Sequence, residues 1–128
     1  MRDQDVTVRQ AAPDEHAAAM GVLDAAVLEV DAGAVLERIP EDVLVAVEDD
    51  RVLGALVLAG DEVEAVAVRP GRRGQGVGSA LVEAAAERRG RIVAEFDDGV
   101  RPFYEALGFE VESGGNGRCR GVRLAARR

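Results

Sequence analysis

Lysine and tryptophan are absent from this 128-residue sequence, which also contains only one cysteine, one tyrosine and three phenylalanines. Aromatic residues make up 3% of the chain and hydrophobic residues 48%, so a core of Val, Leu and Ala is expected. A single cysteine, Cys119, excludes an internal disulfide and cannot build a metal site alone, so no metal is expected. The length is that of one domain spanning residues 1–128.

Long hydrophobic runs are also missing. No uncharged run is longer than residues 52–60, which is far shorter than the roughly 20 residues that a membrane-spanning helix needs. The first five residues contain no apolar segment typical of a secretory signal. The sequence therefore predicts a soluble cytoplasmic protein that does not enter a membrane.

Charge is strongly one-sided. All 16 basic residues are arginine, and 24 acidic residues give a formal net charge of −8. Nucleic acid is not an expected partner, because its phosphates would be repelled. Two causes of the missing lysine stay open: the codon bias of a GC-rich genome, or adaptation to concentrated intracellular salt. We favour the second, a halophilic protein, as a hypothesis; equal stability with and without molar KCl would exclude it.

Hydrophobic patterning predicts an α/β chain with the element order β-α-α-β-β-β-α-β-α-β-β. Strands are expected at residues 6–9, 43–47, 51–58, 63–68, 91–96, 109–112 and 121–124. Helices are expected at residues 13–30, with a break near 31–33, then at 34–38, from 77 to Gly90, and from 100 to Gly108. A charged turn is expected at residues 48–50 and a hairpin loop at 113–117. The close turns in the middle favour an antiparallel meander.

A glycine-rich loop between a strand and a helix, residues 66–79, carries the most chemical information. Glycines let the backbone approach a ligand, and free N–H groups at a helix N-terminus bind phosphate. Arg72 and Arg73 add positive charge, so a ligand containing pyrophosphate is expected. The glycine spacing does not match a dinucleotide fingerprint, and without lysine there is no Walker loop.

The residues Arg73-Gly74-Gln75-Gly76-Val77-Gly78 fit the pattern Arg/Gln-x-x-Gly-x-Gly/Ala. This stretch resembles the acetyl-CoA-binding motif of the GNAT superfamily of N-acetyltransferases. Residues 67–70 upstream and residues 103–109 downstream are similar to further landmarks of that family, and the expected element order matches it over essentially the whole chain. The resemblance implies a mixed, mostly antiparallel sheet flanked by helices.

The resemblance also implies roles for particular residues in transfer from acetyl-CoA to an amine. The strand containing Val66, Ala67 and Val68 would splay from its neighbour at a bulge and pair with the pantetheine arm, and the Val68 N–H would donate to the thioester carbonyl. Backbone N–H groups of Arg73, Gly74, Gln75, Gly76, Val77, Gly78 and Ser79 would hold the pyrophosphate. Tyr104 would protonate the departing thiolate, and the amine would attack directly.

The base that deprotonates the amine is left open. Glu64 is favoured because it lies in the strand of Val68, and Glu62, Glu95 and Asp97 are alternatives. Asp97 also departs from the family, in which Asn is common at this position, so contacts with CoA there are in question.

The expected acceptor is an amine of a small molecule or a peptide, and a homodimer through the last hairpin is allowed. Phe103 and Leu107 are expected in the core whatever the function. Two alternatives remain: a non-catalytic module that binds or senses CoA, and an interaction domain that has lost its ligand.

Overall fold

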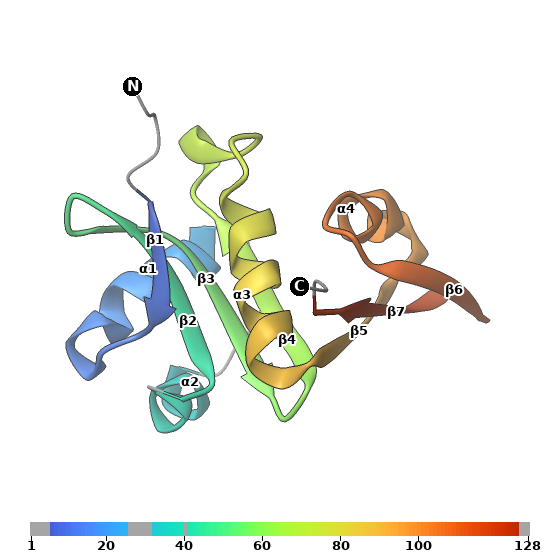
Figure 1. Cartoon of the computed structure of the whole chain (residues 1–128), viewed down its shortest axis with the longest axis horizontal. Helices are drawn as coiled ribbons and strands as arrows, with labels where there is room; N and C mark the ends of the chain where they lie inside the picture. The colour runs from blue at the N-terminus through green and yellow to red at the C-terminus, as the bar shows by residue number, and fades with distance from the viewer. Residues whose placement is uncertain (1–5, 26–31, 40, 126–128) are drawn as a thin grey trace.

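A computed structural model describes residues 6–25, 32–39 and 41–125 of the chain (Figure 1). The strands are β1 Thr7–Gln10, β2 Val43–Glu48, β3 Arg51–Ala59, β4 Glu62–Val68, β5 Arg91–Asp97, β6 Glu110–Gly115 and β7 Arg118–Leu124. The helices are α1 His16–Ala25, α2 Ala32–Arg38, α3 Val77–Arg89 and α4 Arg101–Ala106, with 3-10 turns η1 Pro13–Glu15, η2 Pro70–Arg72 and η3 Asp98–Val100. The seven strands form one sheet in the order β1-β2-β3-β4-β5-β7-β6, antiparallel except between β4 and β5. The predicted mixed, mostly antiparallel sheet is confirmed.

Several of the expected boundaries are wrong; the last strand, for example, begins at Arg118 and not at residue 121. A break in the helix was expected at residues 31–33, but Ala32 and Gly33 are helical and belong to α2. Residues 26–31, which include the end of the first expected helix, lie outside the described part of the chain. The predicted loop at residues 113–117 shrinks to a turn, because β6 continues to Gly115. Asn116 and Gly117 both have positive φ, 57° and 76°, as a two-residue hairpin turn requires.

Helices cover both faces of the sheet (Figure 1). Helix α3 packs on one face, where Leu81 is fully buried, and α1 and α2 pack on the other, where Leu23 and Val35 are fully buried. Gly54 of β3 allows α3 to approach the sheet closely. A Cβ at Gly54 would lie 3.0 Å from both Leu81 Cδ1 and the Ala67 carbonyl oxygen, so any larger residue would push the helix outward.

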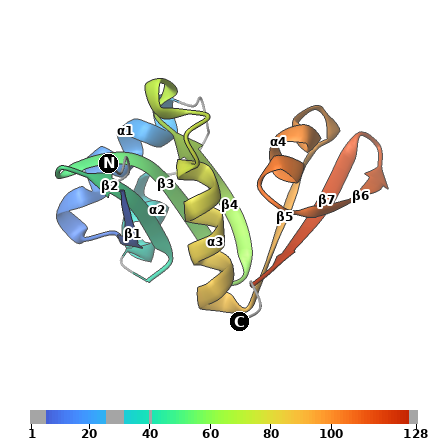
Figure 2. The same cartoon turned by 45° about the horizontal axis from the view of Figure 1, so that its top comes forward.

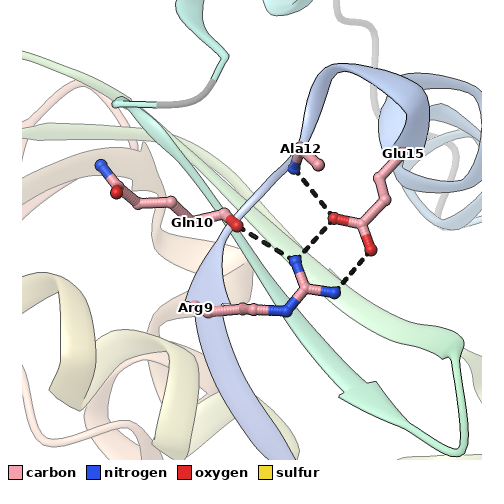
Figure 3. Close-up of polar contacts among 4 residues, drawn as sticks. All are labelled: Arg9, Gln10, Ala12 and Glu15. Atoms are coloured by element: carbon pink, nitrogen blue, oxygen red, sulfur yellow. Dashed lines mark hydrogen bonds and ion pairs between the residues drawn. The ribbon is translucent and has the colours of Figure 1, made fainter.

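A charged contact ties β1 to the start of the first helical segment (Figure 3). The Arg9 guanidinium donates to both carboxylate oxygens of Glu15, at 2.8 and 2.7 Å, and the Ala12 N–H donates to the same carboxylate at 2.9 Å. The hydrogen bonds from Arg9 hold the pKa of Glu15 below its usual range. This arrangement fixes the direction in which the chain leaves the sheet for α1.

Strands β4 and β5 are joined at one end and then diverge (Figure 2). Glu62 with Val93 is the one paired position between them in the described residues, supported by a hydrogen bond from the Val93 N–H to the Asp61 carbonyl at 2.9 Å. Strand β4 also contains a bulge: Ala65 pairs with Val57 and Val63 with Leu58 of β3, which leaves Glu64 as the extra residue. The sheet therefore opens beside the second half of β4.

The far side of this opening is a smaller layer, in which α4 packs on β5 and β6. Tyr104 of α4 stacks on Phe96 of β5, with ring centroids 4.1 Å apart, and meets Phe109 edge-on at 5.4 Å. These three rings join α4 to the strands beneath it. No helix in the described ranges is long and apolar enough to cross a membrane.

Candidate active site

A pocket of about 650 Å³ lies where β4 and β5 diverge. Its wall is formed by three segments: the end of β4, the glycine-rich loop with the first turn of α3, and the region of η3 and α4. The lining residues are Val66, Ala67, Val68, Arg72, Arg73, Gly74, Gly76, Val77, Gly78, Ser79, Val100, Phe103, Ala106 and Leu107. Of the ten residues expected to bind CoA, nine line this pocket; the exception is Gln75.

The end of β4 presents backbone groups to the opening. The Arg69 N–H donates to the Leu53 carbonyl of β3 at 2.8 Å. Because successive residues of a strand alternate in direction, the N–H and C=O of Val68 face away from β3 and toward the pocket. The Val68 carbonyl accepts a hydrogen bond from Arg73 Nε at 3.0 Å. A ligand lying along this edge can therefore pair with β4 as an added strand would.

The glycine loop leads into the N-terminus of α3. Gly74 and Gly76 have φ of 78° and 86°, values that L side chains rarely adopt. Gly76 is the N-cap residue, and its carbonyl accepts the first helical hydrogen bond, from the Ala80 N–H at 3.0 Å. Val77, Gly78 and Ser79 come before Ala80 in the helix. Their N–H groups therefore lie ahead of the first helical hydrogen bond and point out of the N-terminal end of α3. With the positive end of the helix dipole, they form a setting suited to phosphate.

The two arginines of the loop have different surroundings. Arg73 is exposed and bonds to Val68, so its charge lies at the pocket wall. Arg72 donates from Nη1 to Glu48 Oε1 at 2.6 Å and from Nε to Gln75 Oε1 at 2.7 Å. The hydrogen bond from Arg72 lowers the pKa of Glu48. The sequence predicted that both arginines add positive charge, whereas the structure pairs Arg72 with a carboxylate.

The expectation that Phe103 is a core residue is wrong. Its side chain is 48% exposed and lines the pocket, next to Val100, which is 44% exposed. Leu107 is 8% exposed, as expected for the core, and it also reaches the pocket wall. Helical spacing placed Phe103 and Leu107 on one face of the helix expected from residue 100 to Gly108. It could not indicate that this face borders a pocket at one end.

Tyr104 contacts Phe103 of the pocket wall and lies behind that wall, away from the pocket. Its ring is packed against Phe96, Phe103 and Phe109, and within the described residues it is not one of those lining the pocket. Burial raises the pKa of the Tyr104 phenol, so the hydroxyl keeps its proton well above neutral pH. Such a group is suited to donating a proton and unsuited to acting as a base.

The four carboxylates considered as bases are all exposed: Glu62, Glu64, Glu95 and Asp97. Because Glu64 is the bulged residue, the alternation of β4 shifts there. Val63 and Val66 both pack on the α3 face, while Ala65 packs on the α1 face. Glu95 and Asp97 lie opposite Arg120 and Arg118 in the β5–β7 ladder. Glu64 therefore differs from the other three in lying on the pocket strand at the point where it bends.

Side chains of the kinds that bind metals do not gather in the described ranges. There is no group of three or more His, Cys, Asp or Glu residues among them that could hold a metal ion. Cys119 of β7 is buried.

Solved structures share this fold over nearly the whole chain. Ard1 from Thermoplasma volcanium has a TM-score of 0.75 at 19% identity, covering 97% of this chain and 100% of that one. The ribosomal-protein-S18-alanine N-acetyltransferase from Escherichia coli has a TM-score of 0.71 at 16% identity and covers 96% of each chain. N-acetylglutamate synthase from Neisseria gonorrhoeae, solved with coenzyme A and N-acetyl-glutamate, has a TM-score of 0.72 at 19% identity, covering 98% of this chain and 36% of that one.

A comparison with curated protein sequences finds no significant match. At the identities of the solved structures, the likeness is one of fold. A family profile goes further: the profile described as acetyltransferase (GNAT) domain matches residues 40–111, more than half of the chain. This range includes β2 to β5, the glycine loop and all of α3 and α4. The chain therefore belongs to the GNAT family of acetyltransferases.

Proposed function

We propose that this protein transfers an acetyl group from acetyl-CoA directly to an amine of a small molecule or a peptide. The observation that carries the proposal is the pocket itself. The pocket lies between the edge of β4, whose backbone groups face outward, and the N-terminus of α3, which is suited to phosphate. Both segments fall within the residues that match the family profile. A cytoplasmic location, adaptation to salt and a homodimer stay predictions from the sequence.

The pocket residues fit the two chemically different parts of acetyl-CoA. The N–H groups of Val77, Gly78 and Ser79, with the Arg73 guanidinium, suit the pyrophosphate. The apolar wall of Val66, Phe103 and Leu107 suits the pantetheine arm, whose amides can pair with the edge of β4. The thioester supplies the activated acetyl group.

Three groups of this chain would then handle charge and protons. Glu64 takes a proton from the amine, directly or through a water molecule. The Val68 N–H donates to the carbonyl oxygen as negative charge builds on it during attack. The Tyr104 hydroxyl gives its proton to the sulfur as the carbon–sulfur bond breaks, and the amide and free CoA leave.

The assignment of Glu64 predicts the effect of removing its carboxylate. Gln keeps the size of the side chain but cannot take a proton from the amine. Glu64→Gln should therefore lower kcat, measured by initial-rate kinetics, by about 10²-fold. The same measurement on Glu62→Gln, Glu95→Gln and Asp97→Asn provides matched controls. A fall of this size in one of these variants, with Glu64→Gln unaffected, would move the role to that residue.

The experiment that tests the proposed function is calorimetric titration with acetyl-CoA in molar KCl, with NADH and ATP as controls. Saturable binding of acetyl-CoA alone is expected. A ligand at a hundredfold excess over its Kd stabilises the folded state by about 2.7 kcal/mol, so Tm should rise as well. No binding to the folded protein, and no rise in Tm, would show that the proposal is wrong.

A second function, a module that binds or senses CoA without catalysis, is favoured by one observation. Tyr104 lies behind the pocket wall in the described structure, while the CoA-facing residues line the pocket. The two functions predict the same titration and differ in the effect of removing the Tyr104 hydroxyl.

A further inference from the structure

The glycine loop is fastened to the sheet at two places. At its beginning, the Arg69 backbone N–H bonds to Leu53, and Arg69 Nε donates to the Val52 carbonyl at 2.7 Å. At its middle, the Arg72 guanidinium bonds to Glu48 on one side and to Gln75 on the other. We call the second fastening the Glu48–Arg72–Gln75 bridge. It links a residue of β2 to two residues of the loop.

The topology explains how Glu48 reaches the loop. Strands β2 and β4 both run antiparallel to β3, so they are parallel to each other and end at the same edge of the sheet. Glu48 is the last residue of β2, and the loop begins where β4 ends. The Arg72 side chain reaches Glu48 from the loop. The side chains of Arg72 and Glu48 are 30% and 21% exposed, so the pair is partly shielded from water.

Glu48 places a negative charge next to the glycine loop. A carboxylate beside a phosphate-binding loop repels the ligand and, by pairing with Arg72, withdraws a positive charge from it. Between the end of β4 and the start of α3 the loop also contains three glycines, Gly71, Gly74 and Gly76, whose backbone loses much entropy when it is ordered. A planar guanidinium held at Nη1 and Nε fixes the separation of residues 72 and 75 and their distance from β2.

We infer that Glu48 and Arg72 are positioning residues for the acyl donor: their bridge to Gln75 holds the glycine loop in the shape that aligns its N–H groups on the phosphates. Arg72 acts through the loop and is not itself a phosphate ligand, whereas Arg73 supplies the charge at the pocket wall. The inference rests on the proposed function, since the phosphates are those of acetyl-CoA.

The bridge predicts that Glu48→Ala weakens binding although it removes a negative charge. The Kd and KM for acetyl-CoA should rise about three- to tenfold, the effect of losing one partly exposed charge-assisted hydrogen bond, while kcat stays unchanged. Glu48→Gln keeps an acceptor oxygen and should restore part of the loss. The kcat/KM for S-acetyl-pantetheine, which lacks the phosphates, should be the same in all variants. Glu83→Ala, an exposed glutamate of α3 outside the pocket, is the matched control.

Two further measurements distinguish an effect of the bridge on the loop from a direct effect of charge on the ligand. Arg72→Gln should weaken binding at least as much as Glu48→Ala, because it removes the hydrogen bonds to both Glu48 and Gln75. The double variant should be no worse than Arg72→Gln alone, because the contact with Glu48 is already lost there. In the ligand-free protein, amide hydrogen exchange at residues 71–76 should rise in Glu48→Ala.

Three outcomes would overturn an assignment. Tighter binding by Glu48→Ala would mean that Arg72 is a phosphate ligand restrained by Glu48. Unchanged binding and exchange would mean that the bridge does not order the loop. If the wild-type protein does not bind acetyl-CoA, the proposed function fails, and hydrogen exchange still reports whether the bridge orders the loop.

Discussion

Tyr104→Phe is expected to lower kcat by about 10²-fold, the usual contribution of a general acid, while leaving the Kd for acetyl-CoA unchanged. The hydroxyl would act only as the carbon–sulfur bond breaks, so its loss affects the transition state more than the bound ground state. A rapid-mixing measurement of a single turnover, together with calorimetry, separates the two quantities.

The packing of Tyr104 makes this substitution a clean test. Phe keeps the stacking on Phe96 at 4.1 Å and the edge-on contacts with Phe103 and Phe109, because those contacts use the ring alone. The Tm of Tyr104→Phe should therefore remain close to that of the wild type. A fall in kcat without a fall in Tm assigns the hydroxyl to the reaction.

The pH dependence provides a second readout of the same group. Burial raises the pKa of Tyr104, and an acid works only while it is protonated. The raised pKa extends the active range upward, so kcat should not decline on the basic side below about pH 10, the ordinary pKa of tyrosine. An unchanged kcat in Tyr104→Phe, with intact binding, would favour the non-catalytic CoA-binding module.

The fold was predictable because its signals are local. Val63 to Val68 form an apolar run interrupted only by Glu64, Gly90 ends α3, and the run from Arg73 to Gly78 marks a strand-to-helix loop. The errors came where local signals compete. The sequence at 113–117 is rich in glycine and is typical of a loop, yet pairing with β7 extends β6 through Gly115.

The site was predictable only in part, for a related reason. The motif located the backbone groups of the loop, since their role depends on spacing along the chain. It did not reveal the contact between Glu48 and Arg72, which are 24 residues apart and meet because β2 and β4 end at one edge. The resemblance implied a bulge in this strand, but its position at Glu64 depends on pairing with β3 and leaves no pattern in the sequence of β4 alone.

Ser79→Glu is expected to make the protein more stable and its binding of acetyl-CoA about 10²-fold weaker. Ser79 is exposed, lines the pocket and is the third residue of α3, where a carboxylate interacts favourably with the helix dipole. That interaction contributes about 0.3–1 kcal/mol, so Tm should rise slightly. The same carboxylate would lie beside the phosphates. Two like charges about 4 Å apart near a protein surface repel by several kcal/mol before screening.

Ser79→Glu should raise Tm while it lowers the affinity for acetyl-CoA. Misfolding cannot explain this combination, because weaker binding caused by misfolding would be accompanied by a lower Tm. Ser79→Gln is the matched control: it has the same size without the charge, and its affinity should stay within about threefold of the wild type. Raising KCl should narrow the gap between the Glu and Gln variants, since screening acts on the charge alone. If Ser79→Glu binds acetyl-CoA as well as Ser79→Gln does at low salt, the phosphates do not lie at the N-terminus of α3. The pocket would then need a different ligand orientation.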